Sequence, residues 1–250
     1  SIGGIDEAGR GPLAGPVVAA CVILDPDNPV YGVNDSKKLS PKRRAALKLE
    51  IEEKALAVGV GIVDVKTIDA INILEATKLA MKQALDQLKL TPEVLLIDAL
   101  KLPDVEISQQ AIIKGDALSV SIAAASIIAK VARDRYMTDL AKIYPEYGFD
   151  KHVGYGTKLH SEMLNQLGPC PEHRLSFGPL KELKAASRRR IGGYDRDTRS
   201  ASPVTTGGRD SVSEEAIFDT VSSRNAIFVN AKLEEEMSGM TPEERKEFLK

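Results

Sequence analysis

Residues 2–24 read Ile-Gly-Gly-Ile-Asp-Glu-Ala-Gly-Arg-Gly-Pro-Leu-Ala-Gly-Pro-Val-Val-Ala-Ala-Cys-Val-Ile-Leu, and this stretch decides the fold. It predicts a first strand over residues 1–6 that ends in two acids, and a second, buried strand over Val17–Leu24. The glycines between the two strands allow backbone groups to approach a ligand such as a sugar hydroxyl or a phosphate. A tight turn explains the same glycines equally well, and the spacing is neither a P-loop nor a dinucleotide-binding motif.

Outward from this stretch, helices and strands alternate along the chain. We predict further strands at residues 58–63, 94–97 and 106–113, and helices at residues 41–57, 66–88 and 117–141. The first helix has Ser40 as a plausible N-cap and Pro41 at its first position. The short, continuous apolar run Val94–Ile97 is typical of a buried parallel strand. The order of elements therefore predicts an α/β fold with a central mixed sheet flanked by helices.

Composition excludes several classes of protein. The chain has 250 residues and only two cysteines, Cys21 and Cys170, so a disulfide framework and a cysteine-based zinc site are both excluded. No apolar run approaches the roughly 20 residues of a membrane-spanning helix. The N-terminus lacks the pattern of a signal peptide. We therefore expect a cytoplasmic protein that does not act at a membrane.

The net charge of -2 hides two unlike segments. Residues 1–190 carry 26 basic and 24 acidic side chains, whereas residues 191–250 carry 8 and 12. The second segment follows a change of composition, so we divide the chain into a catalytic domain at 1–184, a linker at 185–213 and a C-terminal segment at 214–250. The small overall charge is therefore no argument against a nucleic-acid partner for the first segment.

Two acidic sites lie at the ends of predicted strands, and a third lies just before a predicted helix. Asp6 and Glu7 end the first strand, Asp98 ends the strand at 94–97, and Asp116 precedes a long helix. Ligands of α/β sheets bind beyond the carboxyl ends of the strands, and carboxylates gathered there repel one another unless divalent cations offset their charge. Oxygen ligands of this kind suit Mg²⁺ or Mn²⁺. Taken singly, Asp98 is also a normal turn residue and Asp116 a normal helix N-cap.

Two polar clusters are candidates for nucleic-acid contacts. Asn34–Lys38 places small hydrogen-bonding residues beside two lysines, and Lys151–Lys158 places Tyr155 between two glycines. Each is equally compatible with a solvated loop. Further phosphate contacts are expected from the positions His160, His173 and Arg174.

These motifs together resemble those of one known family, bacterial ribonuclease HII. The resemblance covers about residues 2–183 and rests on long motifs in the same order: residues 4–16, 34–40, 96–99, 114–116, 121–130, 154–158 and 173–177. It implies an RNase H-like fold. It also implies an endonuclease that cleaves the RNA strand of RNA–DNA hybrids and incises on the 5′ side of single ribonucleotides in duplex DNA, as in ribonucleotide excision repair. Its partners would be these nucleic acids, and the family is usually monomeric.

The resemblance also implies roles for individual residues. The metal ligands and catalytic residues of a site with two Mg²⁺ or Mn²⁺ ions would be Asp6, Glu7, Asp98 and Asp116. The ribose 2′-hydroxyl, which distinguishes RNA from DNA, would be read by Gly9, Arg10 and Gly11. Tyr155 would pack against the sugar that follows the ribonucleotide, and Lys37 would contact the nucleic-acid backbone.

Two features depart from the family pattern. Members of the family often carry an N-terminal extension, whereas the signature here begins at residue 3, so we expect part of the first strand to be missing. Residues 222–250 bear a faint similarity to the C-terminal part of Obg-like ATPases but hold no phosphate loop, and a natural appendage and a fused fragment both fit them. Alternative functions are a ribonuclease HIII-like hybrid nuclease, which typically has a Gly-Thr-Gly-like element at 9–11, and a non-catalytic hybrid-binding module, which needs no set of four acids.

Overall fold

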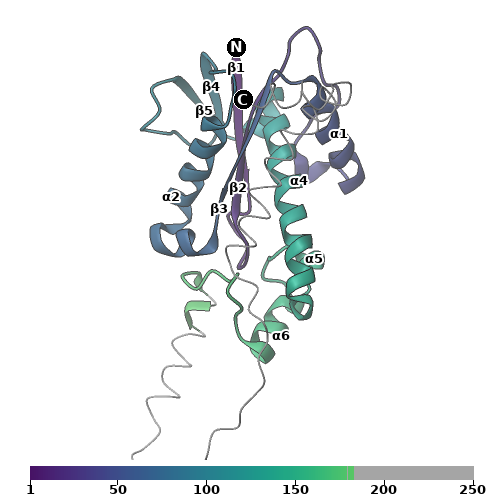
Figure 1. Ribbon diagram of the computed structural model, residues 1–250, viewed down its shortest axis with the longest axis vertical. Helices are drawn as coiled ribbons and strands as arrows, with labels where there is room; N and C mark the ends of the chain where they lie inside the picture. The colour runs from purple at the N-terminus through teal and green to yellow at the C-terminus, as the bar shows by residue number, and fades with distance from the viewer. Residues whose placement is uncertain (179, 183–250) are drawn as a thin grey trace, which may run out of the picture. The chain divides into compact units, whose positions relative to one another are not determined.

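The computed structural model describes residues 1–178 and 180–182, which form a five-stranded sheet with helices on both faces (Figure 1). The strands are β1 (Ile2–Ala8), β2 (Val17–Ile23), β3 (Ala57–Val63), β4 (Val94–Asp98) and β5 (Ser108–Ile112). The α-helices are α1 (Pro41–Lys54), α2 (Val65–Asp86), α3 (Gly115–Leu118), α4 (Val120–Ile143), α5 (Phe149–His152) and α6 (Lys158–Leu167). Two short 3₁₀ helices complete the set, η1 (Ser36–Lys38) and η2 (Pro145–Tyr147).

The sheet is mixed, as the sequence predicted, and its strand order is β3-β2-β1-β4-β5. β2 pairs antiparallel with both β1 and β3, whereas β4 pairs parallel with both β1 and β5. The parallel register aligns Ile5 with Ile97. The next residues along these two neighbouring strands are Asp6 and Asp98, so the topology itself brings two of the predicted acids side by side.

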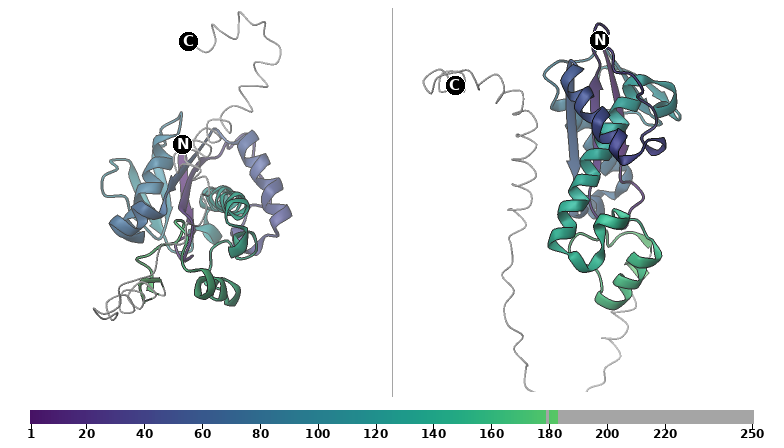
Figure 2. Two further views of the ribbon diagram at one scale, coloured as in Figure 1. Left: turned by 60° about the horizontal axis from the view of Figure 1, so that its bottom comes forward. Right: turned by 90° about the vertical axis from the view of Figure 1, so that its right-hand side faces the viewer.

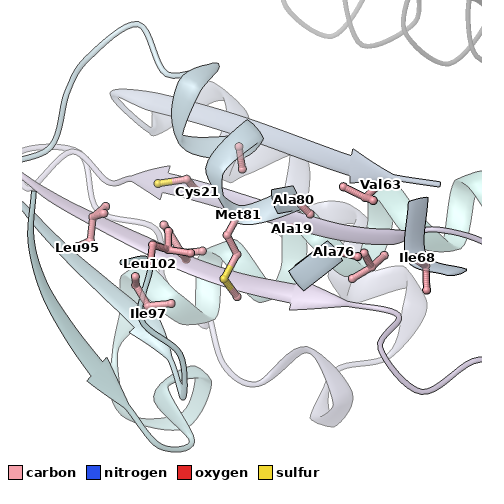
Figure 3. Packing of buried hydrophobic residues seen from close by; sticks show 13 residues of the cluster. Ala19, Cys21, Val63, Ile68, Ala76, Ala80, Met81, Leu95, Ile97 and Leu102 are labelled. Atoms are coloured by element: carbon pink, nitrogen blue, oxygen red, sulfur yellow. The ribbon is translucent and has the colours of Figure 1, made fainter. Parts of the chain in front are cut away.

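Helices bury both faces of the sheet (Figure 2). On one face, Ile68, Ala76, Ala80 and Met81 of α2 pack against the central strands, as Figure 3 shows. On the other face, α1 and α4 cover β2, every residue of which is buried. A strand covered on both sides needs apolar residues at every position rather than at alternate ones, and the run at 17–23 satisfies this.

α4 lies directly on β1 because β1 carries glycine at the crossing. A Cβ atom added to Gly4 would lie 2.1 Å from the backbone carbon of Ser121, so any side chain there would push the helix away. This close approach places the first turns of α4 beside the acidic end of β1.

A third apolar cluster lies around η2, α5 and α6. It joins Leu13 and Ala14 of the loop after β1 to Met137, Phe149 and Leu164 of the later helices. The backbone confirms the junction, because the N–H of Leu13 donates to the carbonyl of Gly154 at 2.8 Å. The loop that follows β1 is therefore held by the C-terminal part of the described chain.

The structure corrects three details of the predicted elements. β1 runs to Ala8, so Asp6 and Glu7 lie inside the strand rather than at its end. The long helix predicted at 117–141 is broken at Ser119, which ends α3 and caps α4 by accepting a hydrogen bond from the N–H of Ile122. α2 is kinked at Asn72, whose φ of 71° is left-handed.

The predicted linker at 185–213 and C-terminal segment at 214–250 lie outside the described residues, as does the stretch at 222–250 with its similarity to Obg-like ATPases. Across the residues that the structure describes, no helix combines the length and the apolar character needed to cross a membrane.

Candidate active site

The four predicted carboxylates come from three elements and interact with one another. β1 supplies Asp6 and Glu7, β4 supplies Asp98 as its last residue, and α3 supplies Asp116. Asp98 is the common member, since its negative charge raises the pKa of each of the other three. We call these four residues the carboxylate cluster.

The backbone around Asp98 is strained in a way that closes the cluster. Ala99, directly after Asp98, has a φ of 54°, and Lys114, two residues before Asp116, has a φ of 58°. Residues other than glycine seldom adopt this left-handed conformation, and they retain it where the surrounding structure imposes it. The chain is thereby turned so that the N–H of Gly115 donates to Oδ1 of Asp98 at 2.8 Å, which brings Asp116 next to β4.

Burial gives this cluster unusual acid–base properties. Burial first, and then repulsion from Glu7, raises the pKa of Asp6 to about 8, although hydrogen bonds from the Glu7 N–H and the Ser126 hydroxyl oppose the shift. Burial also raises the pKa of Glu7, against the attraction of Arg10, and that of Asp116, where Asp35 adds repulsion and Lys37 opposes it. Because the ionised forms are disfavoured, the protein alone does not neutralise this concentration of negative charge.

Two basic side chains beside the carboxylate cluster offset only part of its negative charge. Nη1 of Arg10 lies 3.5 Å from Oε1 of Glu7, and Nζ of Lys37 lies 3.8 Å from Oδ2 of Asp116. Both basic side chains are largely exposed, so each ion pair is weak. Within the described residues, Oε2 of Glu7 is a buried side-chain oxygen without a hydrogen-bond partner.

The oxygen donors fit a hard divalent cation in kind. In the described part of the chain, however, no three His, Cys, Asp or Glu side chains are arranged as a ready-made metal site. A buried carboxylate oxygen without a partner and raised pKa values are the pattern expected of ligands that await a cation. The residues present therefore fit Mg²⁺ or Mn²⁺ through the chemistry of their donors.

The glycine-rich loop and Tyr155 lie beside each other. A Cβ atom added to Gly11 would lie 3.7 Å from Cε1 of Tyr155, so the tyrosine ring borders the Gly9-Arg10-Gly11 segment. Tyr155 as a whole residue is 45% exposed, so it is accessible to a ligand. Its loop is also strained, since Val153 has a φ of 44°. The interpretation of 151–158 as an ordinary solvated loop does not explain that strain.

Three predicted phosphate contacts are wrong. His160, His173 and Arg174 are fully or almost fully buried, at 0%, 1% and 0% exposure. The two histidines hydrogen-bond each other through their Nε2 atoms at 2.9 Å, and Arg174 binds backbone carbonyls. Their role is therefore inside the protein. The sequence pattern misled because charge and polarity do not reveal which way a side chain points.

The prediction that Asp116 is a helix N-cap is also wrong, because Ser119 caps α4 and Asp116 lies within α3. The sequence reasoning missed Ser126, which hydrogen-bonds Asp6 and also Ser36, the latter with an Oγ–Oγ distance of 2.8 Å. The signal for Ser126 was available, since it is the single polar residue in the apolar run at 122–129.

Comparison with known proteins places this geometry in a family. The family model described as Ribonuclease HII matches residues 3–179. The chain is 58% identical over 182 residues to the Ribonuclease HII of Lactobacillus delbrueckii subsp. bulgaricus, covering 73% of this chain and 71% of the relative. It is 61% identical over 176 residues to the Ribonuclease HII of Acetivibrio thermocellus, covering 70% and 69%.

Solved structures share the fold. The ribonuclease H2 from Pyrococcus horikoshii OT3 superposes with a TM-score of 0.63 at 30% identity, over 75% of this chain and 99% of that one. The RNase HII of a PCNA:RNase HII complex from Archaeoglobus fulgidus gives a TM-score of 0.59 at 29% identity, over 72% and 97%. Bst-RNase HIII, solved in complex with Mn²⁺, gives a TM-score of 0.56 at 24% identity, over 76% and 71%, and supports the fold alone.

The family match rejects the ribonuclease HIII alternative and the non-catalytic binding module. Enzymes of this kind use divalent metal ions, in agreement with the oxygen donors gathered at the sheet edge. The chain belongs to the ribonuclease HII family, the enzymes that cleave the RNA strand of RNA–DNA hybrids.

Proposed function

We propose that the carboxylate cluster hydrolyses the phosphodiester bond on the 5′ side of a ribonucleotide, including a single ribonucleotide embedded in duplex DNA. The observation that carries this proposal is the meeting of Asp6, Glu7, Asp98 and Asp116 at one sheet edge, with Oε2 of Glu7 buried and without a partner. Acids placed for structural reasons alone are normally exposed or fully paired, whereas the ion pair of Glu7 with Arg10 leaves the buried Oε2 of Glu7 without a partner.

The cluster would hold two Mg²⁺ or Mn²⁺ ions. When bound, such ions activate the attacking water and neutralise charge on the attacking and leaving oxygens of an in-line displacement. The protein's own contribution is to hold the four carboxylates together, Asp6 and Glu7 on β1, Asp98 on β4 and Asp116 on α3. Ser126 and the N–H of Gly115 orient Asp6 and Asp98 for that purpose. The products are a 3′-hydroxyl and a 5′-phosphate.

The segment Gly9-Arg10-Gly11 would recognise the ribose. Arg10 and Gly11 are exposed and Gly11 adjoins the Tyr155 ring, so a sugar in contact with the backbone of Gly11 would also meet the ring. Tyr155 would then pack against the sugar that follows the ribonucleotide, and a 2′-hydroxyl would be selected by backbone hydrogen bonds. Lys37, beside Asp116, would contact the nucleic-acid backbone near the scissile phosphate.

A cytoplasmic monomer is part of the same proposal. Both cysteines, Cys21 and Cys170, are buried free thiols, as expected for a protein of a reducing compartment. The nucleic-acid partners are RNA–DNA hybrids and DNA duplexes that contain ribonucleotides.

The test is cleavage of a labelled DNA duplex with one ribonucleotide, compared with the same duplex made only of DNA. We expect a single cut 5′ to the ribonucleotide in Mg²⁺ or Mn²⁺, no cut of the all-DNA duplex and no cut with chelator. Asp98→Asn should abolish the cut, whereas Asp27→Asn, in an exposed turn, should leave it unchanged. Full activity of Asp98→Asn, or activity in chelator, contradicts the metal-site assignment.

A further inference from the structure

Two arginines are buried completely beneath the glycine-rich loop. Arg174 and Arg133 are 0% and 1% exposed, and they are the largest of the fully buried side chains in the described residues. Neither makes a close ion pair with a carboxylate within that part of the chain, although the negative charges of Asp69 and Asp134 attract Arg174 and Arg133, respectively, from further away. A buried cation without a counterion is costly unless its N–H groups are well satisfied. The acceptors around the two guanidinium groups therefore decide whether burial of their charge is tolerated.

Arg174 donates only to backbone carbonyls of the loop that follows β1. Its Nη2 lies 2.6 Å from the Gly9 oxygen, its Nη1 lies 3.0 Å from the Arg10 oxygen, and its Nε lies 2.9 Å from the Gly15 oxygen. One rigid guanidinium thus fixes both ends of the loop at once.

Arg133 makes a similar set of bonds, but to the C-terminal end of the same loop and to Val153. Its three nitrogens donate to the carbonyls of Ala14, Pro16 and Val153 at 3.0, 3.0 and 2.9 Å. It therefore ties the loop after β1 to the strained residue that precedes Gly154 and Tyr155. It packs against Gly9 but does not bind the carbonyl of Gly9 or Arg10, so Arg133→Lys is a control for the loss of packing under the loop without the loss of those two bonds.

The neighbours of Arg174 leave it no alternative position. Its ring partner is Phe177, whose centroid lies 5.0 Å from the guanidinium carbon. Its backbone N–H donates to the Leu13 carbonyl at 2.9 Å, and Asp69 binds the next two backbone N–H groups, at residues 175 and 176. Burial lowers the pKa of Arg174 to about 9, so the guanidinium still carries its charge at neutral pH.

The two carbonyls that Arg174 binds belong to peptide groups whose N–H sides are exposed. The Gly9 carbonyl shares its peptide with the N–H of Arg10, and the Arg10 carbonyl shares its peptide with the N–H of Gly11. Neither N–H donates to any acceptor in the described residues, and both residues are exposed. A cation bound to the oxygen of a peptide polarises it and makes its N–H a stronger donor.

We propose that Arg174 is a positioning residue for ribose recognition: by holding the Gly9 and Arg10 carbonyls from inside the protein, it aims and polarises the N–H groups of Arg10 and Gly11 toward the 2′-hydroxyl. This inference rests on the proposed recognition of the ribose by the Gly-Arg-Gly segment. In this proposal the Arg174 side chain does not contact the substrate and acts on it only through the N–H groups of Arg10 and Gly11.

The experiment compares Arg174→Lys with Arg133→Lys. The second variant removes equally buried bonds, to the carbonyls of Ala14, Pro16 and Val153. For each protein we measure KM and kcat on the duplex with one ribonucleotide, the inhibition constant of the matched all-DNA duplex, and the melting temperature. In Arg174→Lys we expect KM for the ribonucleotide duplex to rise about tenfold, the worth of one charge-assisted hydrogen bond. The all-DNA inhibition constant should not change. Arg133→Lys should have a lower melting temperature, but the ratio of its KM for the ribonucleotide duplex to its inhibition constant for the all-DNA duplex should equal that of the wild type.

A second measurement uses the wild-type protein and does not depend on whether a variant folds. The buried Nε–H signals of Arg174 and Arg133 are followed by NMR while each duplex is added with chelator present. We expect the Arg174 signal to shift with the ribonucleotide duplex more than with the all-DNA duplex, and the Arg133 signal to respond equally to both.

The outcomes separate the inference from the function on which it rests. If the wild-type protein does not distinguish the two duplexes in cleavage, the proposed function fails. If it does distinguish them, but both lysine variants change the ratio equally or the Arg174 signal responds equally to both duplexes, the positioning role of Arg174 is refuted.

Discussion

The replacement Asp6→Asn tests the account of the carboxylate cluster most directly. Burial and then repulsion from Glu7 raise the pKa of Asp6 to about 8 in the folded, metal-free protein, against about 3.9 in an unfolded chain. Between these values the folded protein keeps a proton that the unfolded chain has released. The free energy of unfolding therefore falls as pH rises through this window, and this penalty is absent below about pH 4.

The size of the effect at pH 7 follows from the interval between pH 7 and the pKa of the unfolded chain, because pH 7 lies below the pKa of about 8 in the folded protein. Each unit is worth about 1.4 kcal/mol, so this one carboxyl destabilises the metal-free protein at pH 7 by on the order of 4 kcal/mol. Asn has nearly the same shape and cannot ionise. The Asp6→Asn protein should therefore lack a slope of about 1.4 kcal/mol per pH unit between pH 5 and 7.

Urea unfolding with chelator at pH 5, 6 and 7 measures this slope. The difference between Asp6→Asn and wild type should grow with pH in favour of the variant, while Asp27→Asn, in an exposed turn, should follow the wild type. The same Asp6→Asn protein should have no Mg²⁺-dependent incision activity. Parallel pH dependence for Asp6→Asn and wild type would refute the raised pKa, and retained incision would refute the metal role of Asp6.

Three further predictions test the loop, the helix break and the tyrosine. Gly9→Ala should lower the free energy of unfolding by about 2 kcal/mol or more, because Gly9 has a φ of 93° and a Cβ would lie 2.0 Å from Nε of Arg133; a loss below about 0.5 kcal/mol in urea unfolding would contradict this. Ser119→Ala should cost about 1 kcal/mol through the lost cap, and an unchanged melting temperature would argue against the break between α3 and α4. Tyr155→Ala should leave stability unchanged, since the residue is 45% exposed. It should lower cleavage at an RNA–DNA junction while the Mn²⁺ concentration that gives half-maximal activity stays constant; equal loss in both measurements would contradict the stacking role.

Local patterns were sufficient where a residue's environment follows from its neighbours in the chain. The run at 17–23 could only be a strand buried on both faces, and Ser40 with Pro41 marked the start of α1 correctly. The acids Asp6 and Asp98 could be expected close together because both lie toward the carboxyl ends of their strands, although β1 continues past Asp6 to Ala8. These inferences use period, capping and strand direction, all of which are short-range properties of the sequence.

Side-chain direction at long range could not be read in this way. Arg174 looked like a surface contact for phosphate, but its acceptors lie 159 to 165 residues away in sequence, and only folding brings them together. The break at Ser119 was missed because residues 117–141 have no strong helix breaker, and the turn of the chain around Asp98 overrides the local preference.

The sequence alone determined the fold class, the four acids and the family motifs, because each is written in residue types at fixed spacing. Only the tertiary structure decided which charges remain exposed beside the acids and which lie buried beneath the loop after β1. The physical reason is burial: Lys37 and Arg10 remain exposed beside the acids, whereas Arg174 keeps its charge in the interior because three backbone carbonyls replace the water it has lost.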